Sequence, residues 1–139
     1  MITTLTQEDA RALLLETRIG RLGCLYAGGP YVVPVNYVFD GQNIYVHSLP
    51  GRKIEALRAN PRACLQVDEI TDQYRWRSAI AFGNYEDITD ATERDRAVRL
   101  LLARFPQLTP VESVPVHDGQ SSVIVFRICV DEVTGVGEL

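Results

Sequence analysis

The stretch Tyr31–Pro61, YVVPVNYVFDGQNIYVHSLPGRKIEALRANP, decides the fold. Asp40-Gly41 lies between two runs rich in β-branched and aromatic residues, which predicts a β-hairpin with a tight turn. A helix is expected from about Arg52 to Ala59, with Ile54 and Leu57 on one apolar side. The stretch therefore predicts a strand, a turn, a second strand and a helix, in that order.

The start of this predicted helix carries two cations, Arg52 and Lys53. Cations favour the negative, C-terminal end of a helix, so their position breaks a local rule. A helix N-terminus is a common binding site for an anion, most often a phosphate. The alternative is that both side chains point into solvent, and the residues alone leave both interpretations open.

Length and composition favour a small intracellular protein. The chain has 139 residues, so we expect a single domain over residues 1–139. A net charge of -4 and a pI near 5.1 argue against a nucleic-acid binder. We expect neither a signal peptide nor a membrane span, because the N-terminus is polar and no apolar run approaches roughly 18 residues. The three distant cysteines indicate reduced thiols, and no ligand spacing suggests a metal site, so a soluble cytoplasmic protein is expected.

Hydrophobic periodicity predicts further strands and helices on both sides of the hairpin. Pro34 cannot donate a hydrogen bond to a neighbouring strand, so its strand should have an edge, a bulge or an unpaired side there. Small Ala79, Ala81 and Gly83 share one face of a longer strand, which suits the inside of a barrel. The expected segments are a helix from Thr6, strands over 19–27, 62–70, 76–88 and 121–136, and a helix after Asp90.

Six strands with two or three helices interspersed define the fold class as α+β, mainly β, with a small and mostly antiparallel barrel. The proline-rich segment Pro106–Gly119 is expected to be an ordered loop or lid.

Few side chains in the sequence are obvious catalysts. His47 and Ser48 are neighbours on a strand, so they point to opposite faces and do not form a nucleophile–base pair. The other histidine, His117, lies in the proline-rich segment. No GxGxxG or GxxxxGK[ST] loop is present. We therefore assign no catalytic acid or base.

The remaining pattern is a strand that ends in His47-Ser48 and leads into the basic helix start. A hydroxyl group, backbone N–H groups, the Arg52 guanidinium and the Lys53 ammonium would then surround one small anion. A flat ring attached to a phosphate would lie along Pro34–Tyr37, with Asn36 at its polar edge. The alternatives are a barrel-rim position for Asn36 and a core position for Tyr37.

The segment PYVVPVNYVFDGQNIYVHSLPGRKIEALRANPRACLQV (30–67), followed by WRSAIAFGNYEDI (76–88), resembles the FMN-binding split-barrel family of pyridoxamine 5′-phosphate oxidase. Its branch of nitroimidazole-resistance-type proteins is the most similar. The likeness extends from the first helix to about Val130. It implies a six-stranded antiparallel split β-barrel with flanking helices. It also implies a homodimer that holds two FMN molecules between its subunits, and a flavin-dependent reductase or oxidase of a small, nitroaromatic-type substrate.

The resemblance also assigns residues. Arg52 and Lys53 would hold the FMN phosphate, helped by Ser48 and the backbone of His47. Pro34, Val35, Asn36 and Tyr37 would flank the isoalloxazine ring. Trp76, Arg77 and Ser78 match a strand that approaches the flavin in relatives, often from the other subunit.

Two departures from the family keep alternatives open. The chain ends in TGVGEL and lacks the Trp- and Arg-bearing segment with which the true oxidase holds its substrate, so vitamin B6 oxidation is not expected. The branch also contains deazaflavin users and haem binders, so a haem- or deazaflavin-binding module without FMN turnover is the alternative function. Two adjacent cations suit a phosphate better than they suit a haem with His47 as ligand.

Overall fold

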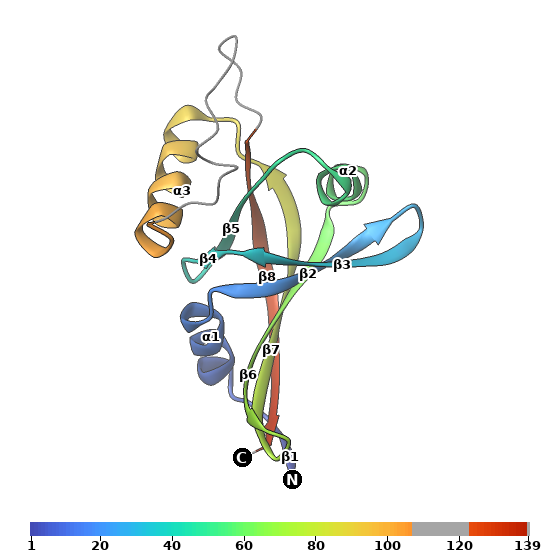
Figure 1. The fold of residues 1–139 in the computed structure, drawn as a ribbon, viewed down its shortest axis with the longest axis vertical. Coiled ribbons are helices and arrows are strands. Elements are labelled where there is room, and N and C mark those ends of the chain that lie inside the picture. The colour runs from blue at the N-terminus through green and yellow to red at the C-terminus, as the bar shows by residue number, and fades with distance from the viewer. Residues whose placement is uncertain (107–122, 139) are drawn as a thin grey trace.

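One antiparallel sheet of eight strands carries three helices in the computed structural model, which describes residues 1–106 and 123–138 (Figure 1). The hydrogen-bonded order of the strands is β3-β2-β6-β7-β8-β5-β4, and β1 pairs with β8. The helices are α1 (Gln7–Glu16), α2 (Arg52–Ala59) and α3 (Ala91–Arg104). The strands are β1 (Ile2–Thr4), β2 (Ile19–Tyr26), β3 (Gly29–Asn36), β4 (Val38–Phe39), β5 (Asn43–Ser48), β6 (Arg62–Asp72), β7 (Arg75–Asp87) and β8 (Ile124–Glu138).

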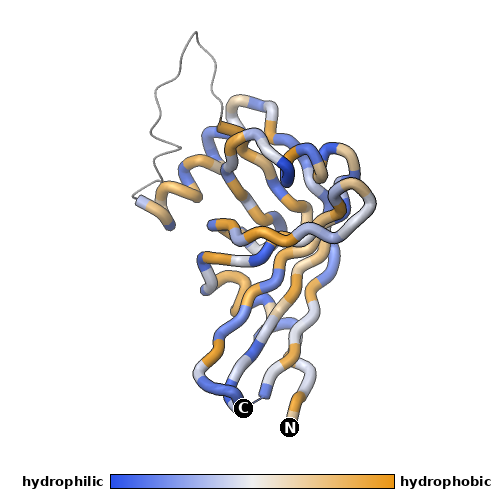
Figure 2. Tube along the Cα trace, turned by 45° about the vertical axis from the view of Figure 1, so that its right-hand side comes forward, coloured by the Kyte–Doolittle hydropathy of each residue, from blue (hydrophilic) through white to orange (hydrophobic). Residues whose placement is uncertain are grey.

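Apolar and polar residues alternate along the long strands, so one face of the sheet forms the core (Figure 2). Leu22, Leu65 and Ala81 are paired across β2, β6 and β7, and all three are fully buried. Helix α1 contributes Leu13 and Leu14 to the same core. Ile19 at the start of β2, in contrast, is 53% exposed.

The two hairpins that frame the predicted site have well-defined turns. Ala27 and Gly28 have φ values of 51° and 82° and form the two-residue loop between β2 and β3. At the predicted Asp40-Gly41 turn, the Asp40 carboxylate accepts hydrogen bonds from the backbone N–H groups of Gln42 and Asn43. This turn joins β4 to β5, as the sequence predicts.

The close approach of β7 and β8 requires glycine at position 83. A Cβ atom at Gly83 would lie 2.2 Å from the carbonyl oxygen of Cys129, which is closer than any real contact. The register of the β7–β8 pair shifts between Phe82 and Gly83. Ala79, Ala81 and Gly83 all face the interior, which confirms the inward small-residue face.

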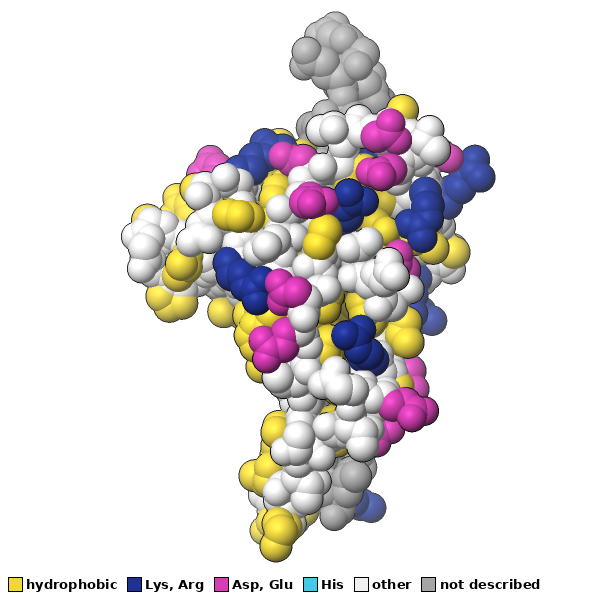
Figure 3. Space-filling view, turned by 180° about the vertical axis from the view of Figure 1, so that it is seen from behind, with side chains coloured by type: hydrophobic (Ala, Val, Ile, Leu, Met, Phe, Trp, Pro, Cys, Tyr) yellow, Lys and Arg dark blue, Asp and Glu magenta, His cyan; other side chains and the backbone are white. Residues whose placement is uncertain are grey.

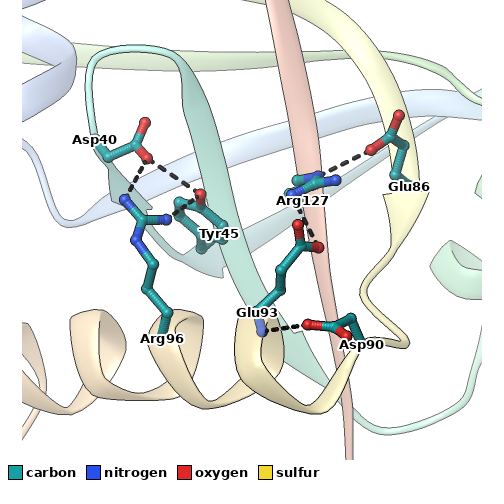
Figure 4. A network of polar contacts seen from close by, with 7 residues as sticks. All are labelled: Asp40, Tyr45, Glu86, Asp90, Glu93, Arg96 and Arg127. Carbon is teal, nitrogen blue, oxygen red and sulfur yellow. Dashed lines mark hydrogen bonds and ion pairs between the residues drawn. The ribbon is translucent and has the colours of Figure 1, made fainter.

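Polar contacts join α3 to the sheet (Figure 4). Arg96 donates a hydrogen bond to the Tyr45 hydroxyl at 2.8 Å and pairs with Asp40 at 3.3 Å. Burial alone would raise the pKa of the Asp40 carboxyl, but the hydrogen bonds from Asn43, Gln42, Tyr45 and Arg96 together hold that pKa below its ordinary value. The negative charge of Asp40 therefore stabilises both the turn and the docked helix.

A second group of contacts holds the first turn of α3. Asp90 caps the helix by accepting a hydrogen bond from the backbone N–H of Glu93, as its position in the sequence predicts. Arg127 of β8 forms ion pairs with Glu86 and Glu93 at 2.9 and 3.5 Å (Figure 4).

Arg104, the last residue of α3, links this helix to the end of α1. Its Nη1 donates a hydrogen bond to the carbonyl of Leu15 at 2.7 Å, and its Nη2 donates to Glu16 at 2.6 Å and Thr17 at 3.2 Å. A cation thus satisfies carbonyl groups that a helix C-terminus leaves without partners.

The fold class agrees with the prediction, but the strand count differs. The described residues form eight strands instead of six, because β1 adds a short strand and the run Tyr31–Phe39 is divided into β3 and β4. The division falls at Tyr37, whose side chain turns into the core. Pro34 lies on β3, the edge strand of the sheet order, as its missing N–H predicts. Apart from Pro106 itself, the predicted loop Pro106–Gly119 lies outside the described residues.

No helix in the described part of the chain is long and apolar enough to cross a membrane. Within the same residues, no group of three or more His, Cys, Asp or Glu side chains is arranged to hold a metal ion.

Candidate functional site

The junction between β5 and α2 leaves the first turn of α2 open to an anion. Gly51 precedes the helix in an extended conformation and makes no side-chain cap. Among the described residues, no atom lies within 4 Å of the position where a Cβ of Gly51 would be. Ser48 is buried and donates its hydroxyl to the carbonyl of Leu49 at 2.7 Å, so this hydroxyl does not cap the helix. The first backbone N–H groups of α2 therefore lack the usual side-chain acceptor.

Arg52 and Lys53 add two positive charges to this helix start. Arg52 is exposed, whereas Lys53 is half-buried, and this burial lowers the pKa of its ammonium group. Within residues 1–106 and 123–138, neither side chain forms an ion pair with a carboxylate. Glu55 lies in the same turn, but among the described residues it forms no ion pair with either cation, so both positive charges remain available to an anion.

The end of the β2–β3 hairpin lies beside the start of α2 (Figure 1). The guanidinium carbon of Arg52 lies 5.5 Å from the ring centroid of Tyr26, the last residue of β2. The Tyr26 ring in turn lies 6.0 Å from the ring of Tyr31, at an interplanar angle of 45°. Sequence reasoning missed Tyr26, because the packing of α2 on β2 joins segments that are far apart in the chain.

The four residues Pro34–Tyr37, which are predicted to flank the isoalloxazine ring, differ in their exposure. Pro34 is exposed and Asn36 is half-buried, so both present side chains outside the core. Val35 is 7% exposed and belongs to the core. Tyr37 is fully buried, and its hydroxyl donates a hydrogen bond to the carbonyl of Leu14 at 2.6 Å. The side chain of Tyr37 thus lies in the core, which was the alternative to a place beside the ring.

His47 and Ser48 have the opposite orientations that a strand requires. His47 is half-buried and is paired with Val125 of β8, whereas Ser48 is buried on the other face.

Trp76, Arg77 and Ser78 lie at the start of β7, next to the β6–β7 turn. Arg77 pairs with Glu69 at 3.2 Å and with Glu16 at 3.5 Å. Figure 1 shows this turn at the lower end of the molecule with both termini, whereas α2 lies at the other end. One chain therefore does not bring Trp76, Arg77 and Ser78 together with Arg52 and Lys53.

The outer face of the sheet near the hairpin carries an open groove of about 330 Å³. Its lining includes Val32, Gly23, Cys64 and Phe82, which are paired across β3, β2, β6 and β7. Val32 is 65% exposed. Viewed from behind, hydrophobic side chains also gather on the projecting hairpin and at the lower end of the molecule (Figure 3).

Fold and sequence place this chain among known proteins. Residues 6–136 match the family described as pyridoxamine 5′-phosphate oxidase, and the chain belongs to that family. It is 30% identical to an uncharacterised protein of Rhizobium meliloti, over 96% of this chain and 93% of that protein.

Two solved structures have the same split-barrel fold. A FAD-binding protein from Mesorhizobium loti is 30% identical and superimposes with a TM-score of 0.84, covering 100% of this chain and 99% of the other. A putative 5-nitroimidazole antibiotic resistance protein from Bacteroides thetaiotaomicron is 23% identical, with a TM-score of 0.79 over 99% of this chain and 87% of the other. The predicted family and fold are therefore confirmed.

Proposed function

We propose that this protein binds FMN through the start of α2 and acts as a flavin-dependent oxidoreductase of a small substrate. The observation that carries the proposal is the open first turn of α2, with Arg52 and Lys53 beside it and no carboxylate partner for either among the described residues. This set of donors fits a phosphate, because a guanidinium binds two oxygens at once and an ammonium adds a point charge.

The flavin would supply the redox chemistry, while the protein supplies binding, orientation and electrostatic tuning. Arg52 and Lys53 would bind the phosphate together with the N–H groups of the first turn of α2. Pro34 and Asn36 have side chains outside the core and would contact the ring from the edge strand β3. No side chain in the described residues is assigned as an acid or base.

FAD is the second candidate cofactor, because the Mesorhizobium loti protein that is 30% identical to this chain binds FAD. FAD carries the phosphate of FMN within its diphosphate, so the same two cations would serve either flavin. Absorbance spectra of the purified protein, followed by mass analysis of the released cofactor, distinguish the two. A Soret band that is lost in His47→Ala would instead support the haem-binding alternative.

The sharpest test is the Lys53→Ala variant. Loss of a charge-assisted hydrogen bond should weaken FMN binding by about 1.5–3 kcal/mol, or roughly 10- to 150-fold, and leave riboflavin binding almost unchanged. The measurement is a fluorescence titration with FMN and riboflavin in parallel. Arg58→Ala is the matched control, since it removes one cation from the last turn of the same helix, where Arg58 pairs with Asp87. Equal FMN affinities in wild type and Lys53→Ala would refute the phosphate assignment.

A homodimer is part of the proposal, because the predicted binding residues lie at opposite ends of one chain. A second copy would cover the apolar groove around Val32 and bring its Trp76, Arg77 and Ser78 to the flavin. Sedimentation analysis should show a dimer for the wild type and a monomer for Val32→Glu. A wild-type monomer that binds FMN fully would refute this arrangement.

The substrate class to test first is the nitroaromatic compounds. When the reduced, flavin-loaded protein is mixed anaerobically with a nitroimidazole, the absorbance of oxidised flavin should return faster than it does for free reduced FMN. Recovery no faster than that of free reduced FMN would refute this substrate class and leave the cofactor proposal intact.

A further inference from the structure

Arg52 contacts the ring of Tyr26, a residue outside the predicted binding set. The guanidinium carbon lies 5.5 Å from the ring centroid, within the range of cation–π attraction. Tyr26 is half-buried, so its ring has less conformational freedom than a fully exposed side chain would have. The ring is also flanked by Tyr31 at 6.0 Å.

The backbone of the β2–β3 hairpin places this ring. Tyr26 is paired with Gly29 across a two-residue loop in which both residues have positive φ. Such a loop has a single register, so Tyr26 lies at a fixed position beside the start of α2. Helix α2 packs on β2, which places Arg52 over this ring.

The contact has a specific consequence for ligand binding. A long, exposed arginine loses rotamer freedom when it binds an anion, and this loss weakens binding. A guanidinium that is attracted to an aromatic ring has already lost part of that freedom. Cation–π attraction does not consume its N–H donors, which remain able to bind phosphate oxygens.

We propose that Tyr26 is a positioning residue that holds Arg52 ready for the flavin phosphate and thereby strengthens the preference for FMN over riboflavin. The proposal rests on the function proposed above, since it needs the phosphate at the start of α2. Lys53 is different, because its side chain is half-buried and its ammonium makes no cation–π contact with any ring in the described residues.

The test compares Tyr26→Leu with Tyr26→Phe by titration with FMN and riboflavin. Tyr26→Leu removes the ring and should weaken FMN binding by about 2- to 5-fold, with riboflavin binding unchanged. Tyr26→Phe keeps the ring and should retain the wild-type preference. In the Arg52→Ala background, Tyr26→Leu should have no further effect, because the residue it supports is gone.

A second readout needs no flavin. The side-chain protons of Arg52 should show a ring-current shift in the NMR spectrum of the wild type and of Tyr26→Phe, and that shift should be lost in Tyr26→Leu. Absence of this shift in the wild type would overturn the contact itself.

The two proposals fail in different ways. A wild type that binds FMN and riboflavin equally refutes the phosphate site, and with it this role of Tyr26. A wild type that prefers FMN, with the same preference in Tyr26→Leu, refutes only the role of Tyr26. Equal loss of FMN and riboflavin affinity in Tyr26→Leu also refutes it, because a positioning role through Arg52 acts on the phosphate alone.

Discussion

The contact between Arg104 and the end of α1 should be one of the main supports for the docking of α3. Arg104→Ala removes three hydrogen bonds from a cation to the carbonyls of Leu15, Glu16 and Thr17. Hydrogen bonds to a charged group contribute about 1.5–3 kcal/mol when buried. A cation at a helix C-terminus contributes about 0.3–1 kcal/mol when exposed, and up to about 2 in partly buried sites.

The exposure of the acceptors decides which of these values applies. Leu15 and Glu16 are exposed, so water will hydrate their carbonyls in the variant, whereas Thr17 is half-buried. The unfolding free energy lost in Arg104→Ala should therefore be close to the contribution of one buried hydrogen bond to a charged group, about 1.5–3 kcal/mol. For a chain of this length, such a loss lowers the melting temperature by roughly 5–15 °C.

The assay is urea unfolding followed by circular dichroism, with Arg99→Ala as the matched control. Arg99 lies on the same helix but is 79% exposed and pairs only with Asp95 among the described residues, so its removal should change the unfolding free energy by less than about 0.5 kcal/mol. Arg104→Lys should be intermediate, because one ammonium cannot match the geometry of a guanidinium with three carbonyls. If Arg104→Ala were as stable as Arg99→Ala, Arg104 would not be a support for α3.

Two further predictions concern the sheet and its pH response. Gly83→Ala should destabilise the fold by about 3 kcal/mol or more, because its Cβ would meet the Cys129 carbonyl and separate β7 from β8. Gly29→Ala is the control, since its Cβ meets only an ordinary contact at 3.7 Å. Similar urea midpoints for both variants would contradict this reason. The folded pKa of Asp40 is depressed, so its stabilising charge is present above the unfolded pKa near 3.8 and is lost as pH falls through the lower folded pKa. The stability difference between wild type and Asp40→Asn should therefore shrink between about pH 5 and pH 2, and a constant difference across that range would contradict the role of the charge.

Local signals in the sequence were sufficient for the elements nearest the site. The bounds of α2 agree with the predicted Arg52–Ala59, because Gly51 before the helix, the apolar pair and the following Asn60-Pro61 all act within a few residues. The Asp40 turn was predictable for the same reason. Pro34 indicated an edge, a bulge or an unpaired side, because a missing N–H donor is a property of one residue, and β3 is indeed an edge strand.

Contacts between distant segments were not predictable in this way. The strand over Tyr31–Phe39 is interrupted at Tyr37, where the hydroxyl donates to the carbonyl of Leu14 on α1 and the backbone N–H donates to the carbonyl of Arg18. The ring of Tyr26 meets Arg52 only because α2 packs on β2. Alternation of apolar residues predicts which face is buried, but it does not indicate which distant segment will cover that face.

The arrangement of the sheet is the main argument for the proposed homodimer. The β6–β7 hairpin is long and carries Trp76 and Arg77 toward the end of the molecule where the termini lie, whereas the β2–β3 hairpin and α2 lie at the other end (Figure 1). Within one chain, Arg77 is held by Glu69 and Glu16, whereas Arg52 and Lys53 at the start of α2 have no carboxylate partner among the described residues. In the proposed homodimer, two copies packed through the apolar face around Val32 would bring these two ends together around one flavin. It follows that Val32→Glu should weaken FMN binding together with dimerisation, although Val32 itself lies outside the predicted binding set.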